Sequence, residues 1–97
     1  MNWQATALAD ADNVAVLLEP VRAGDTVVVQ TPHGMREVVA REAIALCHKI
    51  ALADIAAGAP VLKYGECIGE ARSPIAPGAW VHVHNLQSRR ARGGPGT

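Results

Sequence analysis

The apolar positions of the chain fall into short runs separated by turn residues. The runs richest in Val, Ile and Leu are residues 14–18, 27–31, 35–40 and 50–52. Prolines interrupt every longer pattern, at positions 20, 32, 60, 74 and 77. Because proline breaks helices and restricts pairing in central strands, the pattern predicts a mostly-β domain of many short strands.

A short internal repeat appears when the chain is aligned on three glycines. Each copy has a β-branched residue, two further residues, Gly, two more residues and Val, and the copies are residues 21–27, 55–61 and 75–81. Glycine adopts positive φ at little steric cost, so each copy predicts a tight turn that leads into a strand. Similar apolar stretches precede the first two copies, and we therefore expect two related halves, 14–31 and 50–64, that superpose roughly.

Local patterns predict three further features. Residues 27–40 should form a hairpin, because β-branched runs flank Pro32-His33-Gly34, with His33 as a solvated turn residue. Residues 42–47 have helical propensity but would make only about a turn and a half, so we expect one short helix or a bend there. Asp12-Asn13 is interpreted as a turn in which Asp12 accepts hydrogen bonds from backbone amides.

Composition is consistent with one small domain. The 97 residues are 49% apolar and 19% charged, which excludes a disordered or collagen-like chain. The only aromatic residues are Trp3, Tyr64 and Trp80, which argues against a stacking platform for single-stranded nucleic acid. We expect a domain at residues 1–86 and a disordered, basic, Gly-rich tail at residues 87–97, because the tail has no large apolar residue.

Charge and segment patterns exclude several classes of partner. Nine basic and nine acidic residues cancel, but three arginines lie in the tail, so the body is mildly acidic and lacks the basic face of a duplex-binding domain. The chain shows neither a signal-peptide pattern nor an apolar run near the roughly 18 residues of a membrane span. We therefore expect a cytoplasmic protein without nucleic-acid or membrane partners, in which Cys47 and Cys67 are free, buried thiols.

Residues 79–86 contain the most informative candidate site. In an extended strand, His82 and His84 would project from one face together with Trp80, because side chains alternate. Their Cα separation of roughly 6.5 to 7 Å would let both imidazoles converge on one metal ion or one anionic ligand. A catalytic metal needs three or more ligands, so such a site depends on His48 or a partner chain. The alternative is an amphipathic strand that carries two soluble residues on its outer face.

Two other clusters could supply chemistry, His48-Lys49 and Lys63-Tyr64-Gly65. Lys63 stands five residues after its repeat glycine, where the other two copies have valine. It is either an edge lysine that blocks sheet aggregation or a partly desolvated lysine whose pKa is lowered toward that of a useful base. Gly65 would let the backbone approach a ligand closely, and a plain loop glycine is an equal alternative.

Together these residues resemble the SAF domain of the altronate/galactarate dehydratase family. The resemblance rests on His48-Lys49-Ile50-Ala51-Leu52, on Lys63-Tyr64-Gly65-x-x-Ile68-Gly69 and on Trp80-Val81-His82-x-His84-Asn85-Leu86, in order and at family spacing, over about residues 12–86. It implies a small β-clip fold with pseudo-repeated halves. The chain is similar to the form in which the SAF domain is a separate small subunit. It departs from the pattern at Glu66-Cys67, so the resemblance implies the fold but does not choose among the family's substrates.

The resemblance also implies a function. Members are carbon-oxygen hydro-lyases that remove water from hydroxy acids such as altronate or galactarate, commonly with a divalent metal (Fe²⁺ or Mn²⁺) that this chain would share with its partner or leave to it. A related pair releases sulfite from sulfolactate. The implied partner is a large catalytic dehydratase subunit, without which we expect the chain to be inactive. A non-catalytic carbohydrate-binding, assembly or regulatory module is the alternative, and the sequence leaves a homo-oligomer open.

Removal of a β-hydroxyl from a 2-hydroxy acid requires a base for the α-proton, an acid or metal for the departing oxygen, and cations for the carboxylate. A lysine or histidine as base, with paired histidines as metal or carboxylate ligands, is the version to test. The candidate residues are His48, Lys49, Lys63 and Tyr64 for catalysis, Gly65 and Asn85 for substrate binding, and His82 and His84 for a metal.

Overall fold

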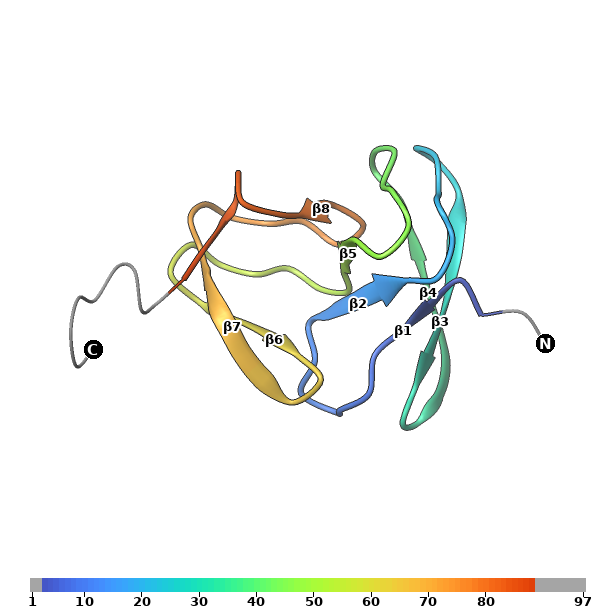
Figure 1. The fold of residues 1–97 in the computed structure, drawn as a ribbon, viewed down its shortest axis with the longest axis horizontal. Coiled ribbons are helices and arrows are strands. Elements are labelled where there is room, and N and C mark those ends of the chain that lie inside the picture. The colour runs from blue at the N-terminus through green and yellow to red at the C-terminus, as the bar shows by residue number, and fades with distance from the viewer. Residues whose placement is uncertain (1–2, 89–97) are drawn as a thin grey trace.

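The structure, a computed structural model, describes residues 3–88, and this part of the chain consists of strands, turns and bends without a helix (Figure 1). The mostly-β prediction is confirmed, and residues 42–47 form a bend and a turn. The strands are β1 (Ala5–Thr6), β2 (Val14–Leu17), β3 (Thr26–Thr31), β4 (Gly34–Val39), β5 (Lys49–Ala51), β6 (Pro60–Lys63), β7 (Glu66–Ala71), β8 (Trp80–Val81) and β9 (Leu86–Gln87).

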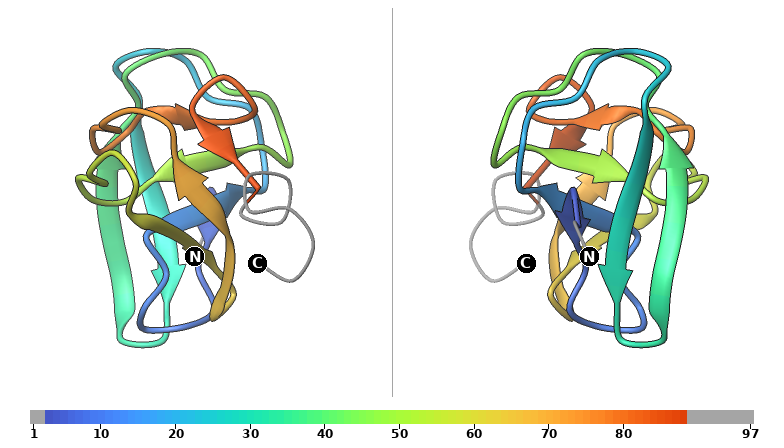
Figure 2. Two further views of the ribbon diagram at one scale, coloured as in Figure 1. Left: turned by 90° about the vertical axis from the view of Figure 1, so that its left-hand side faces the viewer. Right: turned by 90° about the vertical axis from the view of Figure 1, so that its right-hand side faces the viewer.

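Within the described residues, the strands form two sheets. The larger has the order β4-β3-β1-β2-β5-β8 and the smaller the order β6-β7-β9. The β3–β4 hairpin lies on one side of the molecule and the β6–β7 hairpin on the other, and the two views of Figure 2 face them in turn. The hairpin expected at residues 27–40 is therefore confirmed.

The three glycine turns of the repeat are present. Gly24, Gly58 and Gly78 have φ values of 91°, 83° and 87°, and β3, β6 and β8 each begin two residues later. The amide of each glycine donates a hydrogen bond of 2.8 Å to a carbonyl of a facing segment. The third strand ends before the position equivalent to Lys63, so only the first two copies have comparable strands there.

The structure adds a fourth copy of the turn, in which cysteine replaces glycine. Cys47 has a φ of 71°, and its amide donates to the carbonyl of Leu17 at 2.9 Å. The next amide, that of His48, donates to the carbonyl of Ala45 at 3.1 Å, as the amide of Asp25 does to Arg22 in the first copy. A non-glycine residue seldom adopts this conformation, so the glycine pattern alone did not find this turn.

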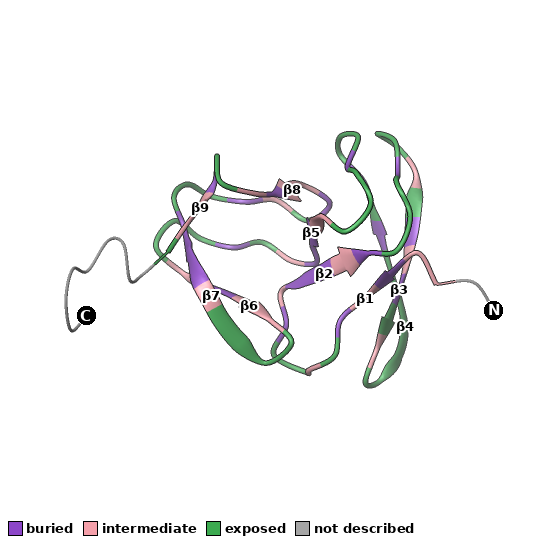
Figure 3. Cartoon of the chain, in the orientation of Figure 1, coloured by how far each residue is buried: buried purple, intermediate pink, exposed green. Residues whose placement is uncertain are grey.

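The four turns form two pairs. Val21 forms a β-bridge with Ile44, and Ile55 forms one with Ile75. Between the pairs, β2 and β5 run antiparallel, and their alternating side chains serve two cores. One core is mainly in the first half and comprises Ala5, Ala7, Ala15, Leu17, Val21, Val27, Val29, Val38, Ala40, Ile44, Ile50 and Leu52. The other is mainly in the second half and comprises Val14, Ala51, Ile55, Val61, Ala71, Ile75 and Val81. Figure 3 shows burial concentrated on the central strands and exposure on the outer hairpins.

Other expectations fare differently. Cys47 and Cys67 are free, but both are exposed; the prediction that they are buried is wrong, because one occupies a turn apex and the other an outer position of β7. Strand β9 includes Gln87, one residue past the expected domain boundary. The tail from residue 89 onward lies outside the described residues. Among residues 3–88, no helix is long and apolar enough to cross a membrane.

Candidate active site

The segment with the paired histidines is a two-residue strand followed by a turn. Strand β8 ends at Val81, and the amides of Asn85 and Leu86 both donate to the carbonyl of His82, at 3.0 and 2.8 Å. The prediction of an extended strand through this segment is therefore wrong. The physical reason is Asn85, whose side-chain amide accepts from the backbone N–H of His82 and donates to the carbonyl of Trp80, both at 2.9 Å. Such local side-chain bonds favour a turn over a strand.

The turn still gathers three imidazoles around one indole. The ring centroid of Trp80 lies 5.1 Å from that of His82, with an interplanar angle of 12°, and 4.9 Å from that of His84. The His48 ring lies 5.7 Å from Trp80 and 5.0 Å from His82. The pairing of β5 with β8 sets Lys49 opposite Val81, and one residue further along, this register brings His48 beside His82. We call His48, Trp80, His82 and His84 the imidazole cluster.

Trp80 is the residue of this cluster that the list of candidates lacked. Its indole Nε1–H donates a hydrogen bond of 3.0 Å to Nδ1 of His48. Its backbone N–H donates to a carboxylate oxygen of Glu42 at 3.1 Å. The sequence placed Trp80 on the same face as the two histidines, but nothing in the spacing signals that His48 and Glu42 meet it from a segment more than thirty residues away.

His48 and Trp80 also line an open, mainly apolar groove of about 470 Å³. The other residues that line it are Pro20, Val21, Ala43, Ile44 and Ala45. The groove therefore borders the imidazole cluster on the side of the first half of the chain.

Positive charge lies close to the imidazole cluster. Desolvation and the charge of Lys63 lower the pKa of Lys49 below its usual value. The pKa of His82 is lowered as well. Desolvation is the largest cause, and the nearby His48, Lys49 and His84 lower it further. From the sequence, a lowered pKa is one alternative for Lys63; the structure shows a lowered pKa at Lys49. Three imidazoles with Lys49 in electrostatic reach of His82 form a site suited to an anion.

Tyr64 and Gly65 occupy the tip of the β6–β7 hairpin. Their φ values of 55° and 81° are the two positive values that a type I′ hairpin turn requires. Both of their amides donate to the carboxylate of the buried Asp12, at 2.9 and 2.8 Å, which confirms the capping role expected of Asp12. Lys63 Nζ lies 5.3 Å from the ring centroid of Tyr64. The Gly65 N–H is thus already engaged by the protein.

The candidate residues therefore fall into groups. His48, His82 and His84 come together around Trp80, Lys49 lies in electrostatic reach of His82, and Lys63 acts in turn on Lys49. Asp12 binds the backbone amides of Tyr64 and Gly65 at the hairpin tip. Both the oxygen and the nitrogen of the Asn85 side-chain amide form hydrogen bonds with the backbone of its own turn.

The described residues do not fit a metal centre supplied by this chain by itself. Between Trp3 and Ser88, no three His, Cys, Asp or Glu side chains are grouped so that they could hold a metal ion. His48 uses Nδ1 to accept from Trp80, and a catalytic metal needs about three protein ligands. The imidazole cluster is better suited to hydrogen bonding and electrostatic binding of an anion.

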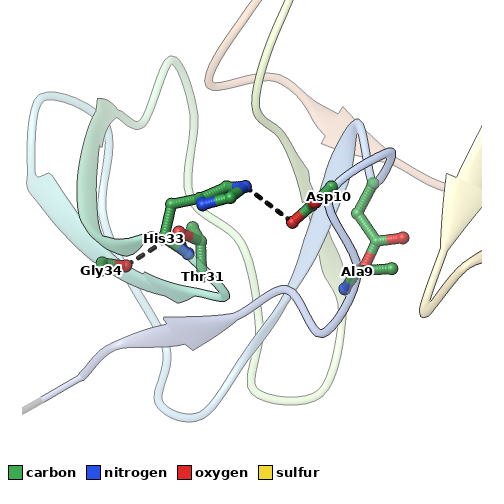
Figure 4. Close-up of polar contacts among 6 residues, drawn as sticks. Ala9, Asp10, Thr31, His33 and Gly34 are labelled. Carbon is green, nitrogen blue, oxygen red and sulfur yellow. Dashed lines mark hydrogen bonds and ion pairs between the residues drawn. The ribbon is translucent and has the colours of Figure 1, made fainter.

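His33 lies apart from the imidazole cluster, beside a second hollow of about 310 Å³ that Asp10, Asp12 and Arg36 also line. Its Nε2 lies 2.9 Å from a carboxylate oxygen of Asp10 (Figure 4). The His33 side chain is 79% exposed, as expected of a solvated turn residue. Its pair with Asp10 therefore contributes little to the stability of the fold.

Comparison with known proteins now gives the family. Residues 3–89 match the family described as the altronate/galactarate dehydratase SAF domain. The chain is 46% identical over 77 residues to altronate dehydratase of Escherichia coli (strain K12), a match that covers 79% of this chain and 15% of that protein. It is 36% identical over 74 residues to galactarate dehydratase (L-threo-forming) of the same organism, covering 74% of this chain and 13% of that one.

A third relative is of similar size to this chain. The (2R)-sulfolactate sulfo-lyase subunit alpha of Chromohalobacter salexigens is 34% identical over 85 residues, which are 84% of this chain and 90% of that subunit. The chain thus spans a small part of the two dehydratases and nearly the whole of a sulfo-lyase subunit. The resemblance found in the sequence is confirmed, and the chain belongs to the altronate/galactarate dehydratase SAF domain family.

Proposed function

We propose that the chain is the small subunit of a cytoplasmic hydro-lyase that dehydrates a sugar acid such as altronate or galactarate together with a large catalytic subunit. The observation that carries the proposal is the imidazole cluster with Lys49 in electrostatic reach, in a chain whose relatives include two sugar-acid dehydratases. A sugar acid is a hydroxylated carboxylate, and clustered cations and N–H donors are the groups that bind one.

In this proposal Lys49, whose pKa is lowered, and the histidines have different roles. A lysine with a lowered pKa has a larger neutral fraction near neutral pH and can accept the α-proton of the substrate. His82 and His84 would bind the carboxylate, and Lys63 would act through its charge on Lys49. Any divalent cation that assists the departing hydroxyl belongs to the partner in this proposal, because this chain lacks a third grouped ligand among its described residues. Asn85 shapes the turn that presents both histidines.

The test is complementation. E. coli altronate dehydratase is prepared without the segment that matches this chain, and the full chain is supplied either as a separate polypeptide or fused in place of that segment. We expect the chain to restore altronate dehydration in at least one format and to show little turnover alone, since about 86 ordered residues offer few walls to exclude water. Failure in both formats, or robust turnover by the chain alone, would contradict the proposal.

The imidazole cluster can be tested in the same assay. His82→Gln and His84→Gln should each abolish most of the restored activity and leave the melting temperature nearly unchanged, because neither side chain is buried and surface substitutions usually shift stability by under about 0.5 kcal/mol. His33→Gln is the matched control and should retain full activity. Wild-type turnover by the His82→Gln, His84→Gln double variant would remove these residues from the mechanism.

A second candidate function is that of a sulfolactate sulfo-lyase subunit. The specific observation in its favour is the match to nearly the full length of subunit alpha. The same anion site suits a substrate with both a carboxylate and a sulfonate. If this chain replaces subunit alpha in the Chromohalobacter enzyme and supports sulfite release, but does not restore altronate dehydration, the second function is favoured.

A further inference from the structure

The hydrogen bond between Trp80 and His48 restricts where the imidazole can carry its proton. An indole Nε1–H can only donate. Nδ1 of His48, at 3.0 Å, must therefore accept, and it can accept only with a free lone pair. The neutral ring then has its proton on Nε2. In a doubly protonated ring, an N–H of His48 would face the N–H of Trp80 at this distance, and the bond would be lost.

Both partners of this bond are fixed by the backbone. His48 follows the left-handed residue Cys47, and its own amide is bonded to Ala45. Trp80 pairs with Ile50 in the β5–β8 ladder, and its amide is bonded to Glu42. The Trp80 side chain also packs against the first core. A turn and a strand pair therefore set the backbone positions of the two residues, and packing against the first core restricts the Trp80 indole.

The groove beside His48 determines which interaction its Nε2 atom can make with a ligand. The residues that line the groove are apolar except for His48 and Trp80, and the indole N–H of Trp80 is used by His48. Among the described side chains that line the groove, Nε2 of His48 is the polar nitrogen that the Trp80–His48 hydrogen bond does not use. Carrying the proton, it is a hydrogen-bond donor and matches an acceptor oxygen.

We infer that Trp80 is a positioning residue that selects Nε2 as the site of the proton on the neutral His48 ring, so that His48 donates a hydrogen bond from Nε2 to an oxygen of the bound anion. In this tautomer Nε2 has no lone pair, so His48 serves neither as the base nor as a metal ligand through Nε2. The part about the tautomer stands on the structure alone. The part about the anion rests on the proposed function and deepens it, because it leaves proton abstraction to Lys49.

The tautomer is measurable on the isolated full-length chain by ¹⁵N NMR of the imidazole nitrogens, at a pH at which the ring is neutral. His48→Gln assigns the His48 signals. We expect Nδ1 of His48 to show the shift of an unprotonated acceptor and Nε2 that of a protonated nitrogen. In Trp80→Phe the two nitrogens should move toward averaged values, whereas the control Trp3→Phe should leave them unchanged. Nδ1–H or averaged signals in the wild-type chain would overturn the inference.

This measurement does not depend on the proposed function, because it needs neither partner nor substrate. The anion part is tested in the complemented dehydratase. If His48 only donates, His48→Gln, whose amide also donates, should retain about tenfold more activity than His48→Leu, the value of one hydrogen bond of about 1.4 kcal/mol. Equal and complete loss in both variants would mean that His48 does more than donate, and would overturn this part. Failure of complementation by the wild-type chain would instead count against the proposed function.

Discussion

The two hairpins of the molecule have turns of the same length but are held in different ways. The β3–β4 hairpin turns at Pro32–His33, and the contacts of that turn are local or exposed: His33 bonds Thr31 and Asp10. The β6–β7 hairpin turns at Tyr64–Gly65, and a buried carboxylate from a distant loop holds both of its turn amides. Six consecutive residue pairs join β3 to β4 without interruption, whereas a register shift between Val61 and Leu62 interrupts the pairing of β6 with β7.

The β6–β7 hairpin is held by side chains that are distant from it in the sequence. Asn13 adds to Asp12 by accepting from the amide of Leu62 at 2.7 Å and donating to the carbonyl of Pro60 at 3.0 Å. Strand β6 thus gains hydrogen bonds from the loop before β2, whereas β3 is supported by its uninterrupted pairing with β4. The turn tethered in this way directly follows Lys63, whose charge lowers the pKa of Lys49.

The largest expected effect is that of Asp12→Ala. Asp12 accepts from the amides of Leu8 and Ala9 as well as from the two turn amides, so its loss leaves several backbone donors without a partner. We expect destabilisation of about 3 to 4 kcal/mol. The control Asp10→Ala removes only the exposed pair with His33 and should change stability by less than about 0.5 kcal/mol. Equal effects in urea denaturation would show that the two hairpins are held alike.

The glycine turns of the two halves should also respond unequally. Both Gly24 and Gly78 have positive φ, but a Cβ at Gly24 would meet open space, whereas one at Gly78 would collide with the backbone carbonyl of Val39. Gly24→Ala should therefore cost about 1 kcal/mol for strain alone. Gly78→Ala should cost about 2 to 3 kcal/mol, because overpacking is added. A cost for Gly24→Ala as large as that for Gly78→Ala, by thermal or urea unfolding, would contradict this account.

The same turns show how far the sequence predicts this fold. The spacing of three glycines and the proline breaks sufficed for the mostly-β class, the glycine turns and the first hairpin, because these features depend on local backbone preferences. The turn at Cys47 was missed, because a cysteine held in the left-handed region by its neighbours has no local signature. The strand expected at residues 82–85 is a turn, because the side-chain bonds of Asn85 override a β-favouring pattern.

The candidate site was predictable in part for the same reason. Residue types and order pointed to His48, His82 and His84, and the structure brings them together. The role of Trp80, the contact with Glu42 and the lowered pKa of Lys49 follow from strand register and burial, which depend on contacts distant in sequence. Asn85 could be identified as informative, but its bonds to the turn backbone emerge only in three dimensions.

A smaller effect should distinguish the cysteine turn from its glycine counterparts. Cys47→Gly relieves a left-handed conformation that costs a non-glycine residue about 1 to 2 kcal/mol, but it adds about 0.5 to 1 kcal/mol of chain entropy to the unfolded state. We expect a net gain of about 0.5 kcal/mol in the free energy of unfolding. Ala at the same position, which keeps the strain, should give no gain, and destabilisation by Cys47→Gly would mean that the thiol itself is needed.

The smallest expected effect is electrostatic and couples Lys49, in the strand between the two halves, to His82 in the second. The pKa of His82 is lowered in the folded chain, so between that pKa and its ordinary value of about 6.5 the unfolded chain binds more protons. The stability contribution of this group is therefore neutral above pH 6.5 and becomes unfavourable as the pH falls through this window. Lys49→Gln should raise the His82 pKa toward 6.5, as followed by NMR titration. Lys63→Gln, the matched control, should move it less, because the charge of Lys63 acts on Lys49. A larger shift from Lys63→Gln than from Lys49→Gln would place the controlling charge on the β6–β7 hairpin instead of on β5.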